Sequence, residues 1–330
     1  MTAARCTLVA IALLVAAVAT GGCGLGAGEQ VGTVTLSVTR DYGADTLHSK
    51  SDEASESDTV MRVLERNADI STRYGGGFVQ SIDGISGEES AGRSLDWFFY
   101  VNGVESTVGA ADYDLHGDEA IWWDYRDWSA AMRVPAVVGS WPQPFTGGYE
   151  GKTRSVAVEC MGGGDACAEV RQRLEGAGVR VSPAAESSEG RGSEGSGSGD
   201  SGSDETGSEG SDEDAIRVLV GPWAQVSEDP AAGQIDGGPE ESGVFADFES
   251  NGSGAGMVGL GEDGEPARKF APQAGLVAAT RRYEAPPVWV VTGATQAGVD
   301  AAARLLDEAH LRNRYAVAVE GDETIPLPLR

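Results

Sequence analysis

The sequence predicts an α+β protein in which a small, grasp-like antiparallel sheet with one helix precedes an α/β sandwich region with a disordered acidic insert. Two patterns predict this fold class. Short segments in the first part of the chain alternate apolar and polar residues, as strands of a half-buried sheet do. Later segments twice run from a strand pattern to a helix pattern and back, which is typical of β-α-β units.

The first predicted strand is VTLSVTR, residues 33–39, and the polar residues 43–57 after it are predicted to form a loop. Asp58 is then predicted to cap a short helix. The apolar residues that share one face of the strand are Val34, Leu36 and Val38, and those that share one face of the helix are Val60, Val63 and Leu64.

Further strands complete this first region. Residues 78–82 are predicted to be a strand, and Asp83-Gly84 is predicted to be a turn. Two aromatic strands follow at about 96–102 and 120–126, joined by a loop that contains LHGDE. The result is one helix against a small, mostly antiparallel sheet.

The second region repeats one pattern, and the two repeats lie on either side of the buried strand IRVLVG at 216–221. The predicted strand, helix and strand are at 155–160, 167–178 and 179–181 in the first repeat, and at 288–293, 296–309 and 315–319 in the second.

The start of the chain predicts export. Arg5 precedes an apolar run that is too short to span a bilayer and that ends in small residues, so we expect residues 1–22 to be a signal peptide. The ending TGGC resembles the lipobox of bacterial lipoproteins, in which the cysteine, here Cys23, receives a lipid. The protein is then expected on the outer face of the cell membrane, with a soluble secreted protein as the alternative.

The rest of the chain is expected to divide into two domains. Pro135, Pro142 and Pro144 mark a predicted hinge. The expected divisions are a tether at 23–30, a first domain at 31–130, the hinge at 131–154, and a second domain at 155–330 with an acidic linker at 186–214.

Two cysteines remain in the exported chain, Cys160 and Cys167. They are close enough in sequence to close a small loop, and an exported protein is in an oxidising compartment, so a disulfide is predicted. A metal or redox pair is the alternative, but the spacing is not CxxC and no histidine lies nearby.

The formal charge of −28 repels phosphates, so we expect no nucleic acid partner. The acidic linker contributes part of that charge. It has no aromatic or branched apolar residue and is predicted to be disordered. A calcium site is the alternative, but calcium loops need a fixed spacing of carboxylates that this segment lacks.

The two aromatic strands raise the question of what covers them. Neighbouring residues of a strand point to opposite faces, so Trp97 and Tyr100 face opposite ways, as do Trp122 and Tyr125. One helix covers one face only. The second face is therefore expected to meet the other domain, a partner protein or a ring-shaped ligand.

The residues between 31 and 130 resemble bacterial domains related to the C-terminal domain of transcobalamin and intrinsic factor. The motifs that carry the resemblance are the aromatic strand ending in VNG at 101–103 and the Gly117-Asp118 turn that leads into Trp123-Asp124-Tyr125. The resemblance implies a corrinoid ligand. If the protein captures such a ligand, we expect a membrane importer to receive it. The predicted ligand-binding residues are Trp97, Tyr100, Asn102, Trp122 and Tyr125.

We expect a non-catalytic binding protein that needs no cofactor and has no resident metal. The three histidines are scattered, and no nucleophile or zinc motif occurs. A carboxylate-based hydrolase remains an alternative, as does a structural or adhesive envelope module whose aromatic face binds a protein or its own second domain. The loop TGATQAG at 292–298 is a weak candidate for a phosphate site, because it lacks the lysine of nucleotide-binding loops.

Overall fold

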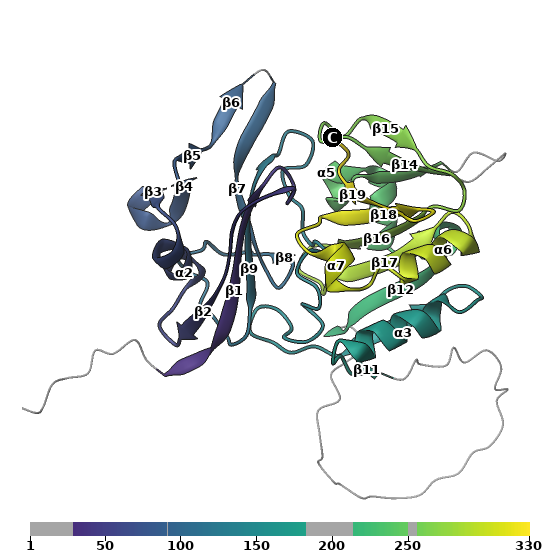
Figure 1. The fold of residues 1–330 in the computed structure, drawn as a ribbon, viewed down its shortest axis with the longest axis horizontal. Helices are drawn as coiled ribbons and strands as arrows, with labels where there is room; N and C mark the ends of the chain where they lie inside the picture. Colours follow the sequence, from purple (N-terminus) through teal and green to yellow (C-terminus); the bar gives the residue numbers. More distant parts are fainter. Residues whose placement is uncertain (1–28, 91, 183–213, 250–255) are drawn as a thin grey trace, which may run out of the picture.

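The computed structural model describes residues 29–90, 92–182, 214–249 and 256–330. Two mixed sheets lie side by side in it, one from the first part of the chain and one from the second (Figure 1). The fold is α+β, as predicted.

The first sheet has six strands in the order β2-β1-β9-β7-β6, with β8 paired to β7. The pairing of β1 with β9 is parallel, and the other pairings in this sheet are antiparallel. The strands are β1 Gln30–Arg40, β2 Asp45–Ser55, β6 Glu88–Ser90, β7 Arg93–Val101, β8 Val104–Glu105 and β9 Ala120–Asp127.

Two details of this region differ from the sequence prediction. The segment predicted to be a loop at 43–57 contains β2, an edge strand whose mostly exposed residues need no apolar alternation. The helix α2 (Val60–Asn67) is capped by Thr59, whose hydroxyl accepts a hydrogen bond from the Arg62 amide. Asp58 does not cap it, because its carboxylate accepts hydrogen bonds from Ser55 and Arg66 instead.

A small antiparallel sheet lies beside α2. It consists of β3 Ile70–Arg73, β4 Phe78–Ile82 and β5 Ile85–Ser86, with the short helix η1 Tyr74–Gly76 between the first two strands. The predicted strand at 78–82 is thus confirmed, and Asp83 and Gly84 both have positive φ, as a tight turn between β4 and β5 requires.

The second sheet has seven strands in the order β11-β10-β12-β17-β16-β18-β19. Both predicted β-α-β patterns are present, and β16 lies between the two strands of the second one. The strands are β10 Val156–Cys160, β11 Val181–Ser182, β12 Ile216–Pro222, β16 Gly275–Thr280, β17 Val288–Gly293, β18 Ala316–Glu320 and β19 Glu323–Leu327.

The helices α3, α6 and α7 cover one face of this sheet. A third, antiparallel sheet lies on the other face, together with the short helices α4 and η3. The predicted helix at 296–309 is two helices, because Asp307 caps the second one by accepting a hydrogen bond from the His310 amide. The helices are α3 Ala166–Gly176, α4 Trp223–Val226, η3 Ala232–Gly237, α5 Pro239–Ser242, α6 Gln296–Ala303 and α7 Glu308–Leu311, and the third sheet is β13 Ala246–Glu249, β14 Gly256–Leu260 and β15 Pro266–Lys269.

Both faces of the first sheet are covered where it is aromatic. On one face, the alternate residues of β1, β7 and β9 pack with the apolar residues of α2 in one hydrophobic core. On the opposite face, Tyr100 and Trp122 belong to a core that also contains Tyr315, Phe245 and Leu276 of the second part of the chain. The second sheet and its surroundings are therefore the cover that the sequence pattern requires.

The segment predicted to be a hinge, residues 131–154, is packed against both sheets. Trp141 and Phe145 contact Trp289 of β17, with ring centroids 6.0 and 4.8 Å apart. The amide of Val137 donates a hydrogen bond to Gly103, and the amide of Val138 donates one to Tyr315. The segment thus helps to hold the two sheets in one arrangement.

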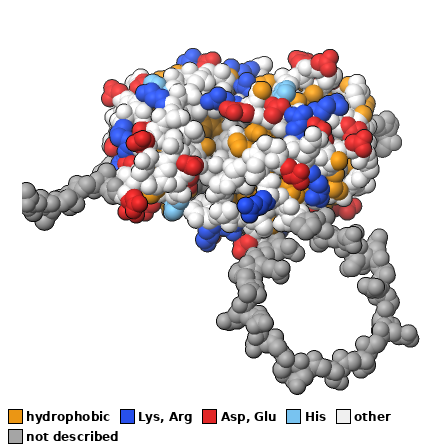
Figure 2. Space-filling model, turned by 60° about the horizontal axis from the view of Figure 1, so that its bottom comes forward, with side chains coloured by type: hydrophobic (Ala, Val, Ile, Leu, Met, Phe, Trp, Pro, Cys, Tyr) orange, Lys and Arg blue, Asp and Glu red, His pale blue; other side chains and the backbone are white. Residues whose placement is uncertain are grey.

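The predicted signal peptide, Cys23 and the acidic linker, except Asp214, lie outside the described residues. Asp214 forms an ion pair with Arg154 at 2.8 Å. Among the described residues, no helix has the length and apolar composition to cross a membrane. Acidic and basic side chains are interspersed on the face drawn in Figure 2.

Replacing Tyr100 with alanine should destabilise the protein by about 3 to 5 kcal/mol, because the ring is fully buried between the two sheets. Urea unfolding followed by tryptophan fluorescence measures this change. The matched control is Tyr74→Ala, which removes a ring that is 87% exposed and should change stability by less than about 0.5 kcal/mol. Equal effects of the two substitutions would contradict the packing of the aromatic face.

Candidate functional site: a cleft between the two sheets

Aromatic rings hold the two sheets together beside the cleft. The ring of Tyr315, directly before β18, lies with its centroid 5.3 Å from Trp122 and 5.8 Å from Tyr100, in edge-to-face contacts. It also contacts Tyr42, from the turn between β1 and β2, at 5.0 Å. Such geometry stabilises aromatic pairs beyond the area that they bury.

A buried carboxylate, Asp124, lies within this aromatic contact. The hydroxyl of Tyr315 donates a hydrogen bond to it at 3.0 Å, as does the amide of Gly43. Thr39 donates to the same carboxylate, and the Thr39 hydroxyl in turn accepts a hydrogen bond from the Trp122 indole. Burial raises the pKa of Asp124 to about 6, although these hydrogen bonds lower it in part.

The five residues predicted to bind a ligand do not share one open surface. Trp97 and Tyr125 pack together on the α2 side of the sheet, where their polar atoms donate hydrogen bonds to the carbonyls of Ile85 and Ser86. Tyr100 and Trp122 pack together on the side that faces the second sheet.

Asn102, the fifth of these residues, lies in the turn after β7 and has positive φ. Its side chain donates a hydrogen bond to the Gly148 carbonyl and accepts one from the Ala120 amide. All five residues are buried, and Trp122 alone of the five lines a cleft.

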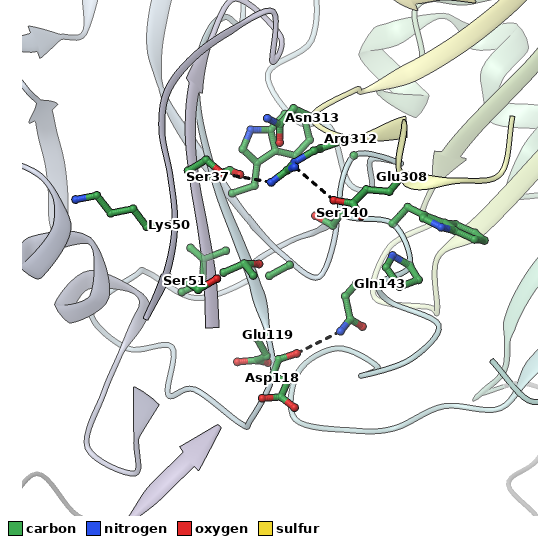
Figure 3. Close-up of a pocket in the computed structure, with 18 of the residues that line it drawn as sticks. Ser37, Lys50, Ser51, Asp118, Glu119, Ser140, Gln143, Glu308, Arg312 and Asn313 are labelled. Carbon is green, nitrogen blue, oxygen red and sulfur yellow. Dashed lines mark hydrogen bonds and ion pairs between the residues drawn. The ribbon is translucent and has the colours of Figure 1, made fainter. Parts of the chain in front are cut away.

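That cleft lies where the covered face of the first sheet continues onto β1 and β2, and it has a volume of about 380 Å³ (Figure 3). On β7 and β9 this face carries aromatic side chains, whereas on β1 and β2 it carries the small hydroxyl side chains of serine and threonine. Thr35 lies opposite Ser51 in the register, and Ser37 lies opposite Ser49. The hydroxyls that line the cleft from these two strands are those of Thr33, Thr35, Ser37, Ser49 and Ser51.

The opposite wall comes from the rest of the chain. Residues 139–143 of the packed segment form its lower part, and α7 with the two residues after it forms its upper part (Figure 3). The guanidinium of Arg312 reaches across and donates a hydrogen bond to the Ser49 hydroxyl at 3.3 Å. The amide of Asn313 donates a hydrogen bond to the Gly139 carbonyl, which joins the two segments that form this wall.

The cleft has charges of opposite sign at its two ends. Arg312, which pairs with Glu308, lies at one end, and Asp118 lies at the other (Figure 3). Glu119 is buried and accepts hydrogen bonds from the Tyr113 hydroxyl and the His116 amide, and burial raises its pKa. Lys50 points away from the cleft and donates a hydrogen bond to the Asn67 carbonyl.

Two other predicted features have structural roles. Cys160 and Cys167 form a disulfide, with their Cα atoms 5.9 Å apart, as predicted. In the loop at 292–298, a Cβ on Gly293 or Gly298 would lie 2.8 or 2.2 Å from the Ala274 carbonyl oxygen, so close packing accounts for these glycines. Thr295 caps α6 by accepting a hydrogen bond from the Gly298 amide.

A comparison with known protein families finds a match for one part of the chain. Residues 57–127 match the family described as Domain of unknown function (DUF4430). The match falls within the region that resembles the transcobalamin-related domains, and it covers less than half of the chain. The curated proteins contain no match to this chain.

Among solved structures, the chain is similar to one from Ruminococcus gnavus ATCC 29149 that is described as "a putative metal binding protein". The similarity covers 29% of this chain and 97% of that chain, with 15% sequence identity and a TM-score of 0.23. In the part of this chain that the structure describes, no group of three or more histidine, cysteine or acidic residues is arranged to hold a metal ion.

Sequence reasoning missed most of the cleft. The alternating hydroxyls of β1 were visible as the polar positions of the first predicted strand, and they could have indicated a polar surface. Arg312 and Gln143 had no such signal, because Arg312 reaches the cleft only through the packing of the second part of the chain and Gln143 only through the packing of residues 131–154.

The raised pKa of Asp124 predicts a pH dependence of stability. The unfolded chain releases this proton near pH 4, whereas the folded protein keeps it to about pH 6. The contribution of Asp124 is therefore complete below pH 4 and is lost as the pH rises through 6. The unfolding free energy of wild type, relative to Asp124→Asn, should fall by roughly 1 kcal/mol per pH unit across this window.

Urea unfolding at several pH values measures this difference. Asp127→Asn is the matched control, because the pKa of Asp127 is lowered in the folded protein, whereas that of Asp124 is raised. Burial raises its pKa, but hydrogen bonds from Ser129, Arg93 and Ser94 lower the pKa overall. Its contribution should be lost as the pH falls. The same slope for both variants would contradict the burial of Asp124.

Proposed function

We propose that the protein is a non-catalytic binding protein that holds a small polar molecule in the cleft between its two sheets. The observation that supports this proposal most strongly is the row of hydroxyls in the cleft. Within the described part of the chain, the hydroxyls of Thr35, Ser37 and Ser51 make no hydrogen bond to protein atoms, so they are free to bind a ligand.

The size of the cleft supports the same function. A volume of about 380 Å³ is within the range of ligand pockets. Its walls come from β1 and β2 on one side and from residues 139–143 and α7 on the other, so a ligand would contact both parts of the protein.

The finer proposal is that this molecule is a corrinoid and that an importer in the membrane receives it. The resemblance of residues 31–130 to the transcobalamin-related domains supports this identity. Two observations count against this identity. Tyr100 and Trp122 are buried, and a corrinoid is larger than the cleft volume of about 380 Å³.

A structural or adhesive envelope module is the second candidate. One observation favours it: the aromatic face is already covered by the protein's own second part, so the rings need no ligand to bury them. The two candidate functions predict different behaviour of the cleft: a binding protein would hold a small molecule there, and a purely structural module would not.

We expect Thr35→Trp to abolish ligand binding, because Thr35 is exposed and its side chain lies in the cleft, where an indole would fill the space. Calorimetric titration of the mature chain in detergent with cyanocobalamin, a disaccharide and tetraalanine tests this. Thr46→Trp is the control, since Thr46 is exposed on β2 and lies outside the cleft. Wild-type protein that binds none of the three ligands would favour the structural module.

The proposed location is the outer face of the cell membrane, with the lipid at Cys23. Stable anchoring needs two acyl chains, and each buried CH₂ contributes about 0.8 kcal/mol. Replacing Cys23 with serine should therefore release the protein into the medium, as fractionation and immunoblotting would show. Retention of this variant in the membrane would contradict the lipid anchor.

A further inference from the structure

We infer that the cleft selects an extended zwitterionic molecule about as long as four amino acids, such as a short peptide with both ends free. This inference rests on the proposed binding function of the cleft, and it names a peptide as the ligand in place of the corrinoid. The amine would lie beside Asp118, and the carboxylate would lie beside Arg312.

The positions of the charges give the ligand its length. The Asp118 carboxylate accepts a hydrogen bond from the Thr33 amide at 2.7 Å, so it lies at the Thr33 end of β1. Arg312 contacts Ser49, which lies opposite Ser37. Thr33 and Ser37 are four residues apart in an extended strand, so the charged ends are about 13 Å apart. An extended peptide of about four residues spans that distance.

Both charged ends are available to a ligand. Only one Asp118 side-chain oxygen accepts a hydrogen bond within the described part of the chain, so the other is free to accept one from an amine. Arg312 is exposed and pairs with Glu308 at 3.4 Å, and such surface pairs contribute little stability. A carboxylate can therefore replace Glu308 or Ser49 as the partner of this guanidinium.

The middle of the cleft suits the middle of a peptide. Thr35, Ser37 and Ser51 can both donate and accept hydrogen bonds, which matches the alternating carbonyl and amide groups of an extended chain. Gln143 lies on the opposite wall, where its side chain donates to the Asp118 carbonyl at 3.2 Å and accepts from the Gly147 amide. The wall is thus held in place before a ligand arrives.

Calorimetric titration with four forms of tetraalanine tests this inference: free at both ends, N-acetylated, C-amidated and blocked at both ends. We expect each block to weaken binding at least tenfold. Asp118→Asn, which keeps the acceptor for the Thr33 amide, should remove the preference for a free amine alone. Arg312→Gln should remove only the preference for a free carboxylate and keep the preference for a free amine.

Glu308→Gln is the matched control on α7. It removes the competing partner of Arg312, so it should tighten binding of the free peptide, whereas loss of a merely structural pair would leave affinity unchanged. Titrations with the disaccharide and with the Thr35→Trp variant distinguish failure of the proposed binding function from failure of the zwitterion preference. Binding that Thr35→Trp abolishes but that ignores the peptide ends would overturn the zwitterion alone. The absence of any binding that depends on the cleft would overturn both.

Discussion

The contact between Tyr315 and the aromatic face of the first sheet determines the arrangement of this protein. It brings Tyr315 against Tyr100 and Trp122, and it provides a hydrogen bond for the buried carboxylate of Asp124. Thr39 and Gly43 donate the other hydrogen bonds to this carboxylate, and Tyr315 and its neighbours bury the rings of Tyr100 and Trp122. The aromatic face therefore requires the second part of the chain as its cover, and the two sheets are parts of one packed structure.

The cleft is a consequence of this packing. The second part of the chain covers the aromatic strands β7 and β9 but leaves the hydroxyls of β1 and β2 at its margin. α7 follows the same margin because it ends four residues before Tyr315, and Arg312, directly after α7, thereby lies across from Ser49. The residues that hold the sheets together thus also place both walls of the proposed binding site.

The sequence predicted the faces of the first sheet better than it predicted the site. Alternation showed that Tyr100 and Trp122 need a cover, but periodicity cannot tell a protein cover from a ligand. β2 escaped prediction because an exposed edge strand has no apolar alternation, and so did β16, which is buried throughout. Arg312 and Ser49 are 263 positions apart, and no local pattern relates residues so distant.

A double-mutant cycle between Trp122 and Tyr315 tests the docking of the two sheets most directly. The unfolding free energies of wild type, Trp122→Leu, Tyr315→Leu and the double variant give the interaction energy of the two rings. Rings whose centroids lie 5.3 Å apart should show a coupling of about 0.5 to 1.5 kcal/mol. Additive effects of the two substitutions would contradict the contact, and with it the origin of the cleft.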